Sequence, residues 1–417
     1  MSFSKQLLIL GNGFDLHCGL KSSYKDFFRS EILYAANGLK LLQPGVSGFW
    51  ESLLLEYYKI KKNDDYNWCD IETIIKKTLW QLFVKSDLAK SSLWHYVLEI
   101  SKIKIVLNNS NTSFASIEDY ILMHCRNFIY NYKYRNMSDD DLTNLLIQNL
   151  CQELHGFEKR FCRYLKNQIE KSNNKNNQYE EYIIKAVNLI AYITGFSNTK
   201  YENIDNIIHQ EEKAFEKSIT PTQKTVTWKN INVLSNDFIK LKTTNILNFN
   251  YTALFDLLEV ESPCCYNNVH GKLCSKHCTE DCNTSNIIFG IDDRVTQSHD
   301  TNSVLRLFSK TYRKMSDTSS PTNILPANDG TPIVIKFYGH SLSEADYSYF
   351  QSIFDYYNLY GNSNISLMFY YSKGFEQNDA IYKLINAYGQ TLSNQDQGKN
   401  LIHKLLLENR LKIVEIP

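Results

Sequence analysis

Five short polar motifs in this chain stand directly after stretches whose composition is typical of buried strands. They combine glycine with asparagine, aspartate or histidine, residue types that turn the chain and bind ligands. The motifs are Gly11-Asn12-Gly13-Phe14-Asp15, Asn248-Phe249-Asn250-Tyr251-Thr252, His270-Gly271, Gly290-Ile291-Asp292-Asp293 and Gly339-His340-Ser341-Leu342. In open α/β sheets, ligands bind outside the carboxyl ends of the strands. We therefore expect these segments, although remote in sequence, to converge on one ligand site.

Asn250 and His270 are the strongest candidates for catalysis. A carboxamide at one strand end can orient a water or a ribose, and an imidazole at a neighbouring end can act as a general base or hold a ribose hydroxyl. Each also has an ordinary structural interpretation, Asn250 as a turn former and His270 as a histidine at a turn before glycine. Their occurrence together with a glycine turn favours the functional interpretation.

The turn Gly11-Asn12-Gly13 follows the first buried stretch and precedes a helix. Glycines there let backbone N–H groups approach a phosphate closely. The turn does not complete a GxGxxG fingerprint, because Leu16 stands where the third glycine belongs. The chain also lacks a GxxxxGK[ST] segment, which disfavours a P-loop ATPase. A tight turn without a ligand is the alternative interpretation.

The elements that must position these motifs are predicted from apolar patterning. Short apolar runs predict strands, and helical spacing separates several of them. The runs are Lys5–Leu10, Thr244–Asn248, Cys264–Val269, Asn286–Phe289, Ile333–Phe337, Ile365–Tyr371 and Leu411–Ile416. This alternation indicates an open, parallel α/β sheet of Rossmann type. Residues 1–38 and 241–417 are expected to form that nucleotide-binding domain, and 39–240 a mainly helical insertion.

The amino-acid composition argues for some classes of protein and against others. The chain has 417 residues, 43% of them hydrophobic, which is enough for a packed core. Lys+Arg and Asp+Glu are both 45, and this balance argues against an extended nucleic-acid surface. The apolar run Leu7–Leu10 is too short for a signal peptide, and no stretch approaches a membrane span. We expect a cytoplasmic protein whose 10 cysteines are mostly reduced or metal-bound.

A cysteine-rich run follows the His270-Gly271 pair. Cys274, His277, Cys278 and Cys282 supply thiolates and an imidazole, which are the ligands that zinc prefers. The spacing lacks the paired CxxC knuckles of zinc ribbons. A structural zinc at the rim of the site and a reduced, cysteine-rich surface loop are therefore both open interpretations.

Several segments resemble the AbiH family, bacterial proteins of abortive phage infection. They occur in the family's order over nearly the whole chain. The segments are LLILGNGFDLHCGLKSSYKDFF from Leu7, NWCDIE from Asn67, ILNFNYT from Ile246, VHGKL from Val269, IIFGIDD from Ile287 and FYGHSLSEADYSYF from Phe337. The resemblance implies an antiphage defence protein.

The order of the polar motifs is also similar to that of sirtuin-type Rossmann domains, which bind NAD and cleave its bond to nicotinamide. In this resemblance, Gly11 and Gly13 match the glycine turn, and Asn250 matches the asparagine that orients the nucleophile. His270 matches the histidine of the HG pair, and Gly339 with Ser341 the late ribose and phosphate turn. Further cofactor contacts are expected from Asn12, Phe14, Tyr251, Asp292 and His340. The chain departs from the sirtuin pattern at Thr252, where an acidic residue is usual, and at Asn12, where alanine is usual.

The resemblance implies hydrolysis of NAD to nicotinamide and ADP-ribose. Water attacks the anomeric carbon beside Asn250 and His270, and a carboxylate such as Asp15, Asp292 or Asp293 stabilises the developing positive charge. A non-catalytic nucleotide sensor or scaffold is the alternative, and a toxin acting on nucleic acid is disfavoured by the neutral charge. Expected partners are a small-molecule nucleotide, a phage-encoded trigger and a second copy of the chain, without a membrane.

Overall fold

The computed structural model describes most of the chain in separate ranges. These are residues 5–33, 48–60, 70–85, 93, 96–97, 116–131, 137–175, 178–194, 244–254, 265–273, 286–292, 306–315 and 323–416. The chain forms two compact units, which are described separately below. The sheet unit comprises residues 1–22, 165–286 and 319–417, and the helical unit comprises 23–164 and 287–318.

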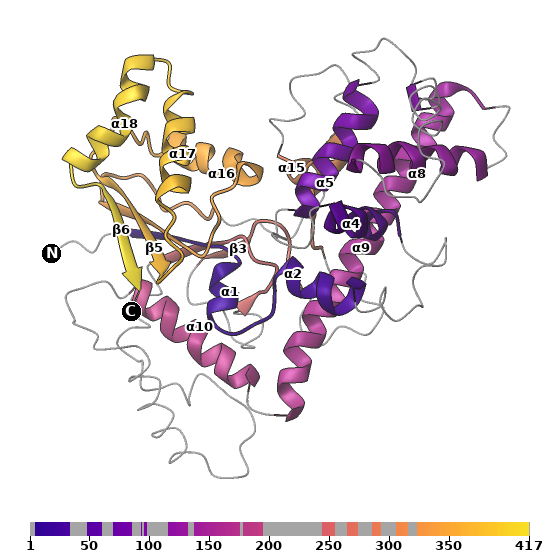
Figure 1. The fold of residues 1–417 in the computed structure, drawn as a ribbon. Coiled ribbons are helices and arrows are strands. Elements are labelled where there is room, and N and C mark those ends of the chain that lie inside the picture. The colour runs from indigo at the N-terminus through magenta and orange to yellow at the C-terminus, as the bar shows by residue number, and fades with distance from the viewer. Residues whose placement is uncertain are drawn as a thin grey trace. The chain divides into compact units, whose positions relative to one another are not determined.

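Within its described residues, the sheet unit is built on six parallel strands (Figure 1). The strands are β1 Lys5–Leu10, β2 Thr244–Asn248, β3 Tyr266–Asn268, β4 Ile333–Tyr338, β5 Ile365–Ser372 and β6 Leu411–Ile416. Their order across the sheet is β3-β2-β1-β4-β5-β6, the doubly wound order of Rossmann folds. In β1, the run from Gln6 to Leu10 is buried throughout, as expected for a parallel strand covered on both faces. The predicted open parallel sheet is therefore confirmed.

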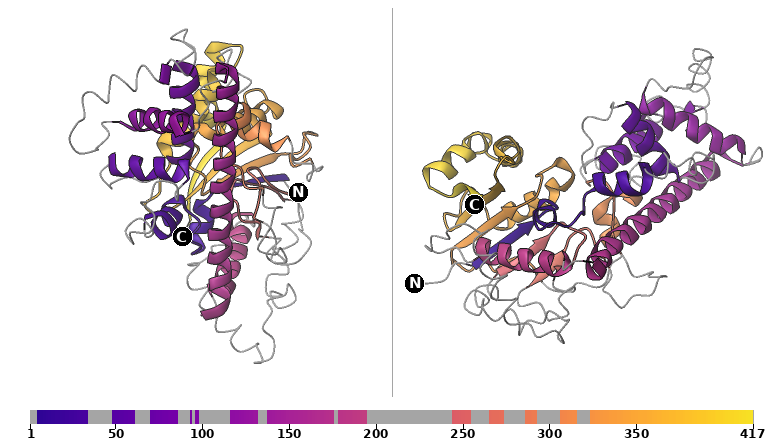
Figure 2. Two further views of the ribbon diagram at one scale, coloured as in Figure 1. Left: turned by 90° about the vertical axis from the view of Figure 1, so that its right-hand side faces the viewer. Right: turned by 60° about the horizontal axis from the view of Figure 1, so that its bottom comes forward.

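One face of the sheet packs against three helices, α16 Tyr347–Tyr356, α17 Asn378–Gly389 and α18 Gln395–Leu407 (Figures 1 and 2). Leu7 and Ile9 of β1 point to this face and join a cluster with buried residues of all three helices. The period of two along a strand explains why alternate residues share this face.

The opposite face of the sheet packs against α10 Gln178–Thr194 (Figure 2). Gln6 Nε2 donates to Thr194 O at 3.0 Å, and Lys336 Nζ donates to Ile193 O at 2.6 Å. The last carbonyls of a helix have no intrahelical partner and carry the negative end of the helix dipole, so a buried ammonium is favourable there. These contacts explain why a lysine stands in the middle of the buried strand β4.

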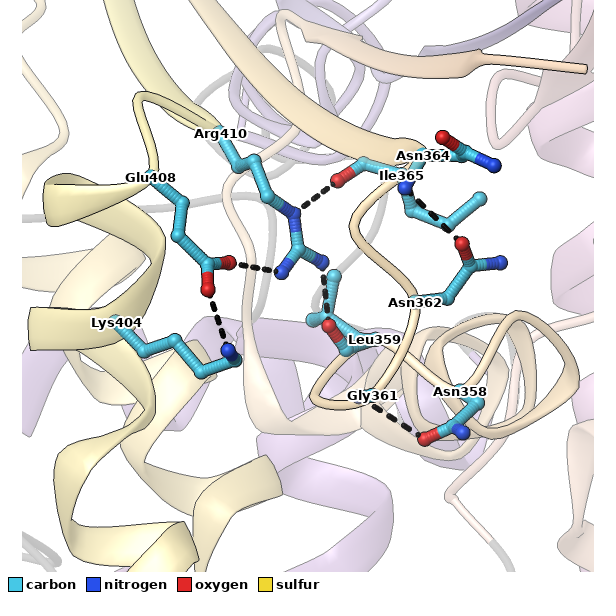
Figure 3. A network of polar contacts seen from close by, with 9 residues as sticks. All are labelled: Asn358, Leu359, Gly361, Asn362, Asn364, Ile365, Lys404, Glu408 and Arg410. Atoms are coloured by element: carbon cyan, nitrogen blue, oxygen red, sulfur yellow. Dashed lines mark hydrogen bonds and ion pairs between the residues drawn. The ribbon is translucent and has the colours of Figure 1, made fainter.

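Arg410 lies in the turn before β6 and connects it to the segments that precede β5 and β6 (Figure 3). Its Nε donates to Ile365 O at 2.6 Å, and its terminal nitrogens donate to Leu359 O at 2.5 Å and Glu408 Oε2 at 2.7 Å. The guanidinium is buried. One side chain thus joins the turn before β5 to the turn before β6.

The helical unit is formed by short helices and the greater part of one long helix. Its elements are α2 Tyr24–Phe27, the π-helical turns η1 Phe28–Leu33 and η2 Trp80–Val84, α4 Phe49–Ile60, α5 Asp70–Leu79, α8 Ile117–Asn131, most of α9 Asp139–Lys175, the 3₁₀ turn η5 Arg306–Phe308 and α15 Lys310–Lys314. Ser23 is the N-cap of α2, and its side chain accepts from the N–H of Asp26. A partly buried ion pair joins Glu158 to Arg313 at 2.7 Å, and a buried one joins Glu72 to Lys310 at 2.5 Å.

Two expectations differ from the structure. The strand expected at Asn286–Phe289 does not form, since residues 286–290 are irregular and Phe289 N–H donates to Glu158 Oε1 at 2.8 Å instead of to a neighbouring strand. The unit boundaries also differ from the expected 1–38 with 241–417 and 39–240. Helix α10 belongs with the sheet, and residues 287–318 belong with the helices. No helix in the described ranges is long and apolar enough to cross a bilayer.

Candidate functional site

The register of the parallel strands aligns the segments that carry most of the predicted site. Leu10 pairs with Asn248 on one side and with Tyr338 on the other, and Asn248 pairs with Asn268. These four residues form one row across β3, β2, β1 and β4. The polar motifs that follow them therefore leave the sheet at the same edge, as predicted from the sequence.

Two asparagines in this row hold the segment that carries Asn250. Asn248 Oδ1 accepts from Asn250 N–H at 3.1 Å, and Asn248 Nδ2 donates to Thr252 O at 2.9 Å. Asn268 Nδ2 donates to Asn250 O at 2.8 Å and to Thr252 O at 3.0 Å. Residues 250–252 thus have a fixed backbone path at the end of β2. Sequence reasoning did not assign this supporting role to Asn248 and Asn268.

The Asn250 side chain is 2% exposed, and neither of its amide atoms makes a hydrogen bond to any described residue. Leaving such a group buried and unpaired costs about 1–3 kcal/mol, so most buried polar groups have partners. Asn268 Oδ1, Ser341 Oγ and Ser343 Oγ are buried in the same condition. These atoms all belong to β3 or to segments after β2 and β4, as groups that await a polar ligand would.

His270 is held by Asp346, a residue that sequence reasoning missed. His270 Nε2 lies 2.8 Å from Asp346 Oδ1, and His340 Nε2 lies 3.4 Å from Asp346 Oδ2. All three side chains are buried. Asp346 precedes α16, so the segment after β4 brings its carboxylate to the histidine that follows β3. The only signal in the sequence is an acidic residue at a helix start, which is usually a cap.

Aromatic rings surround these two histidines. The Phe249 ring centroid lies 5.4 Å from that of His270 and 4.6 Å from that of His340. Phe350 of α16 lies 5.0 Å from His340. This apolar cover lowers the local dielectric, so the hydrogen bond between His270 and Asp346 is stronger than it would be in water.

The glycine of the His270-Gly271 pair has a steric explanation. Gly271 has φ +79°, and a β-carbon there would collide with the backbone carbonyl of Asn286. The side chain of Asn286 in turn accepts from Lys272 N–H at 2.9 Å. A larger residue at position 271 would push the chain away from this contact and shift His270.

The turn Gly11-Asn12-Gly13 packs against the turn after β4. Gly11 N–H donates to Tyr338 O at 3.0 Å, and Gly13 N–H donates to Gly339 O at 2.8 Å. These two N–H groups are therefore used within the protein, and close packing already explains both glycines. The side chain of Asn12 also has a partner within the protein, because its Oδ1 accepts from Ser22 Oγ at 2.6 Å.

Asp15 lies beneath the same edge, on the face covered by α10. Its two carboxylate oxygens accept from Tyr182 Oη at 2.8 Å and from Thr252 Oγ1 at 2.5 Å. Burial raises the pKa of Asp15 to about 6, although the two hydroxyl hydrogen bonds lower it. Thr252, one of the two departures from the sirtuin pattern, is thus a direct partner of this carboxylate.

Phe14, Tyr251 and Asp292, which the sequence also predicted to contact the cofactor, make contacts outside the hydrogen-bond groups described above. Phe14 packs edge-on against Tyr338, and Tyr251 O accepts from Leu273 N–H at 2.7 Å. Asp292 belongs to the helical unit.

The proposed zinc ligands Cys274, His277, Cys278 and Cys282 lie outside the described residues, as does Asp293. Within the described ranges, no group of three or more histidine, cysteine, aspartate or glutamate side chains is arranged to hold a metal ion. The zinc site therefore stays a prediction.

The strand order and the aligned strand ends define a doubly wound α/β protein of Rossmann type. The chain belongs to the AbiH family of bacteriophage abortive infection proteins, whose family model matches residues 7–371. No curated protein and no solved structure matches the chain. The family supports a role in abortive phage infection.

Proposed function

We propose that this AbiH protein binds NAD at the carboxyl edge of its sheet and hydrolyses it to nicotinamide and ADP-ribose during phage infection. The observation that carries the proposal is the buried Asn250 carboxamide, which makes no hydrogen bond to any described residue. A carboxamide can both donate and accept, as the ordering of a ribose hydroxyl or a water requires. It follows β2, whose neighbour β3 leads to a buried histidine.

His270 would serve as the general base. A carboxylate that fixes one ring nitrogen of a histidine sets its orientation and leaves the other nitrogen to exchange protons. In the proposed reaction the oxygen of water bonds to the anomeric carbon of the nicotinamide ribose, while the bond from that carbon to the nicotinamide nitrogen breaks. The electron pair of the broken bond stays on nicotinamide, and His270 accepts the proton that water loses.

Asp15 would supply negative charge beneath the site. With a pKa of about 6, its carboxylate is mostly ionised at neutral pH. Thr252 links it to the segment that Asn248 and Asn268 hold. A fixed anion in a low-dielectric setting stabilises a transition state of oxocarbenium character.

The burial of Asn250 also bears on regulation. A ligand can reach its amide only after part of the cover moves. We therefore expect little turnover in uninfected cells and faster turnover after infection, as suits a protein of abortive infection. Loss of a cofactor that many enzymes share would then arrest the metabolism of the infected cell.

Two measurements test the proposal. One is chromatography of the products formed when the purified protein is incubated with NAD, and the other is the cellular NAD concentration during phage infection. We expect nicotinamide release or a fall in NAD, and Asn250→Ala should abolish it. Asn267→Ala is the matched control, because Asn267 precedes the row residue Asn268 and lies on the other face of β3. This variant should keep the activity. Protection from phage without any loss of NAD would overturn the proposal, and tight NAD binding without turnover would favour a sensor.

A further inference from the structure

The tautomer of His340 follows from one backbone contact. Leu342 N–H donates to His340 Nδ1 at 2.9 Å. Because an N–H group can only donate, Nδ1 carries no proton, and the neutral ring holds its proton on Nε2. Leu342 has φ +55°, a left-handed conformation that is unfavourable for leucine and that aims its N–H at the ring.

The state of Asp346 follows in turn. Its Oδ2 lies 3.4 Å from the protonated Nε2 of His340, and its Oδ1 lies 2.8 Å from His270 Nε2. Asp346 is 0% exposed. The N–H of His340 lies at ion-pair distance from Oδ2 and stabilises the ionised carboxylate, whereas a proton on Oδ2 would oppose it. An ionised Asp346 has no proton to donate, so the 2.8 Å hydrogen bond at its Oδ1 then requires a proton on His270 Nε2.

We infer that Asp346 is a positioning residue, which holds His270 in the Nε2–H tautomer and makes Nδ1 the atom that accepts the proton from the attacking water. Asp346 itself does not touch the substrate. The assignment of the tautomer is independent of any reaction, and its consequence for catalysis rests on the proposed function.

The substitution Asp346→Asn changes the two histidines differently. His340 stays protonated on Nε2, because the Leu342 N–H occupies its Nδ1. It therefore needs the single oxygen of the new amide opposite it. The amide nitrogen must then face His270 Nε2, which becomes an acceptor and moves the proton to Nδ1. The variant keeps the shape of the site and inverts only the tautomer of His270.

Nitrogen-15 NMR of the full chain, with labelled histidine, reads both tautomers directly. The protein has 10 histidines, so His270→Gln and His340→Gln assign the two signals. We expect both rings to be protonated on Nε2 in the unsubstituted protein, and only His270 to change in Asp346→Asn. Glu344→Gln is the matched control, since Glu344 is exposed in the same 3₁₀ turn, η6 Glu344–Asp346. It should leave both signals unchanged.

A proton on Nδ1 of His270 in the unsubstituted protein would overturn the inference, even if Asp346→Asn failed to fold. For the reaction, the loss of a correctly placed base should lower the kcat of nicotinamide release by about 10²- to 10⁴-fold with little change in KM. A fall in kcat with an equally large rise in KM, and with the tautomer of His270 unchanged, would mean that Asp346 only stabilises the fold. The expected NMR signals without any nicotinamide release would uphold the tautomer and reject the hydrolase.

Discussion

Gly13 and Gly339 pack backbone against backbone, so that a β-carbon on Gly13 would lie 2.7 Å from the α-carbon of Gly339. The two glycines follow β1 and β4, the neighbouring strands between which the strand order of the doubly wound sheet reverses. This is the point of the sheet at which such folds bind their ligands. The contact joins the first and the last of the motifs that the sequence singled out.

Gly13→Ala should disrupt this contact. The atoms that a methyl group would meet are backbone atoms, which cannot move aside as a flexible side chain can. Overpacking of this kind costs about 1–3 kcal/mol, so we expect the free energy of unfolding to fall by that amount in urea titrations. We also expect nucleotide binding to weaken, because the turn after β4 carries His340 and Ser341.

Gly156→Ala is the matched control for that experiment. Gly156 lies within α9, and a β-carbon there would meet no atom of the described residues within 4 Å. Alanine favours the helix over glycine by about 1 kcal/mol, so this variant should be more stable than the parent. A Gly13→Ala protein as stable as the parent would show that the two turns do not need their close contact.

Asp15 should make stability depend on pH in an unusual direction. Burial raises its pKa to about 6 from the ordinary aspartate value of 3.8. The folded protein therefore binds the proton more tightly than the unfolded chain, and this contribution to stability is lost as the pH rises through 6. For pKa values of 3.8 and 6 the loss between pH 4.5 and 7.5 is about 2 kcal/mol.

Urea titrations of the parent and of Asp15→Asn at those two pH values measure this loss. The asparagine variant does not ionise at position 15, so subtracting its stability removes the contributions of the other carboxyl groups. The difference, parent minus variant, should fall by about 2 kcal/mol on going from acid to neutral pH. A difference that stays constant or rises would show that Asp15 has no raised pKa.

Part of this architecture can be predicted from the sequence because it depends on local patterns. The run Lys5–Leu10 is apolar without interruption and ends at a glycine, which is typical of a strand covered on both faces. The same pattern failed at Asn286–Phe289. A run of only four residues cannot by its composition distinguish a strand from an irregular segment. In the structure the N–H of Phe289 instead donates to the carboxylate of Glu158, more than a hundred residues away.

The site was predictable only where its residues stand at strand ends. Asn250 and His270 lie on the common edge because parallel strands share one, which motif spacing can indicate. Asp346 was missed because its partner His270 is 76 residues distant and only the folded chain brings them together. Lys336 did carry a signal, because a lysine inside a buried strand requires an acceptor such as the helix end that it reaches.

Arg410→Lys should destabilise the sheet unit although it conserves the charge. The guanidinium of Arg410 reaches two backbone carbonyls and one carboxylate in different directions (Figure 3). A lysine ammonium is a single point on a flexible stem and cannot meet all three. The carbonyls of Leu359 and Ile365 would lose donors, so we expect about 2–4 kcal/mol less free energy of unfolding in urea titrations.

Glu408→Gln is the control for this substitution. The carboxylate of Glu408 is partly exposed, and the amide oxygen of a glutamine there can still accept from the buried guanidinium of Arg410. Ion pairs with an exposed partner contribute about 0–1 kcal/mol, so this variant should remain close to the parent. Equal effects of the two substitutions would mean that the charge pair, and not the two carbonyl contacts, is what Arg410 contributes.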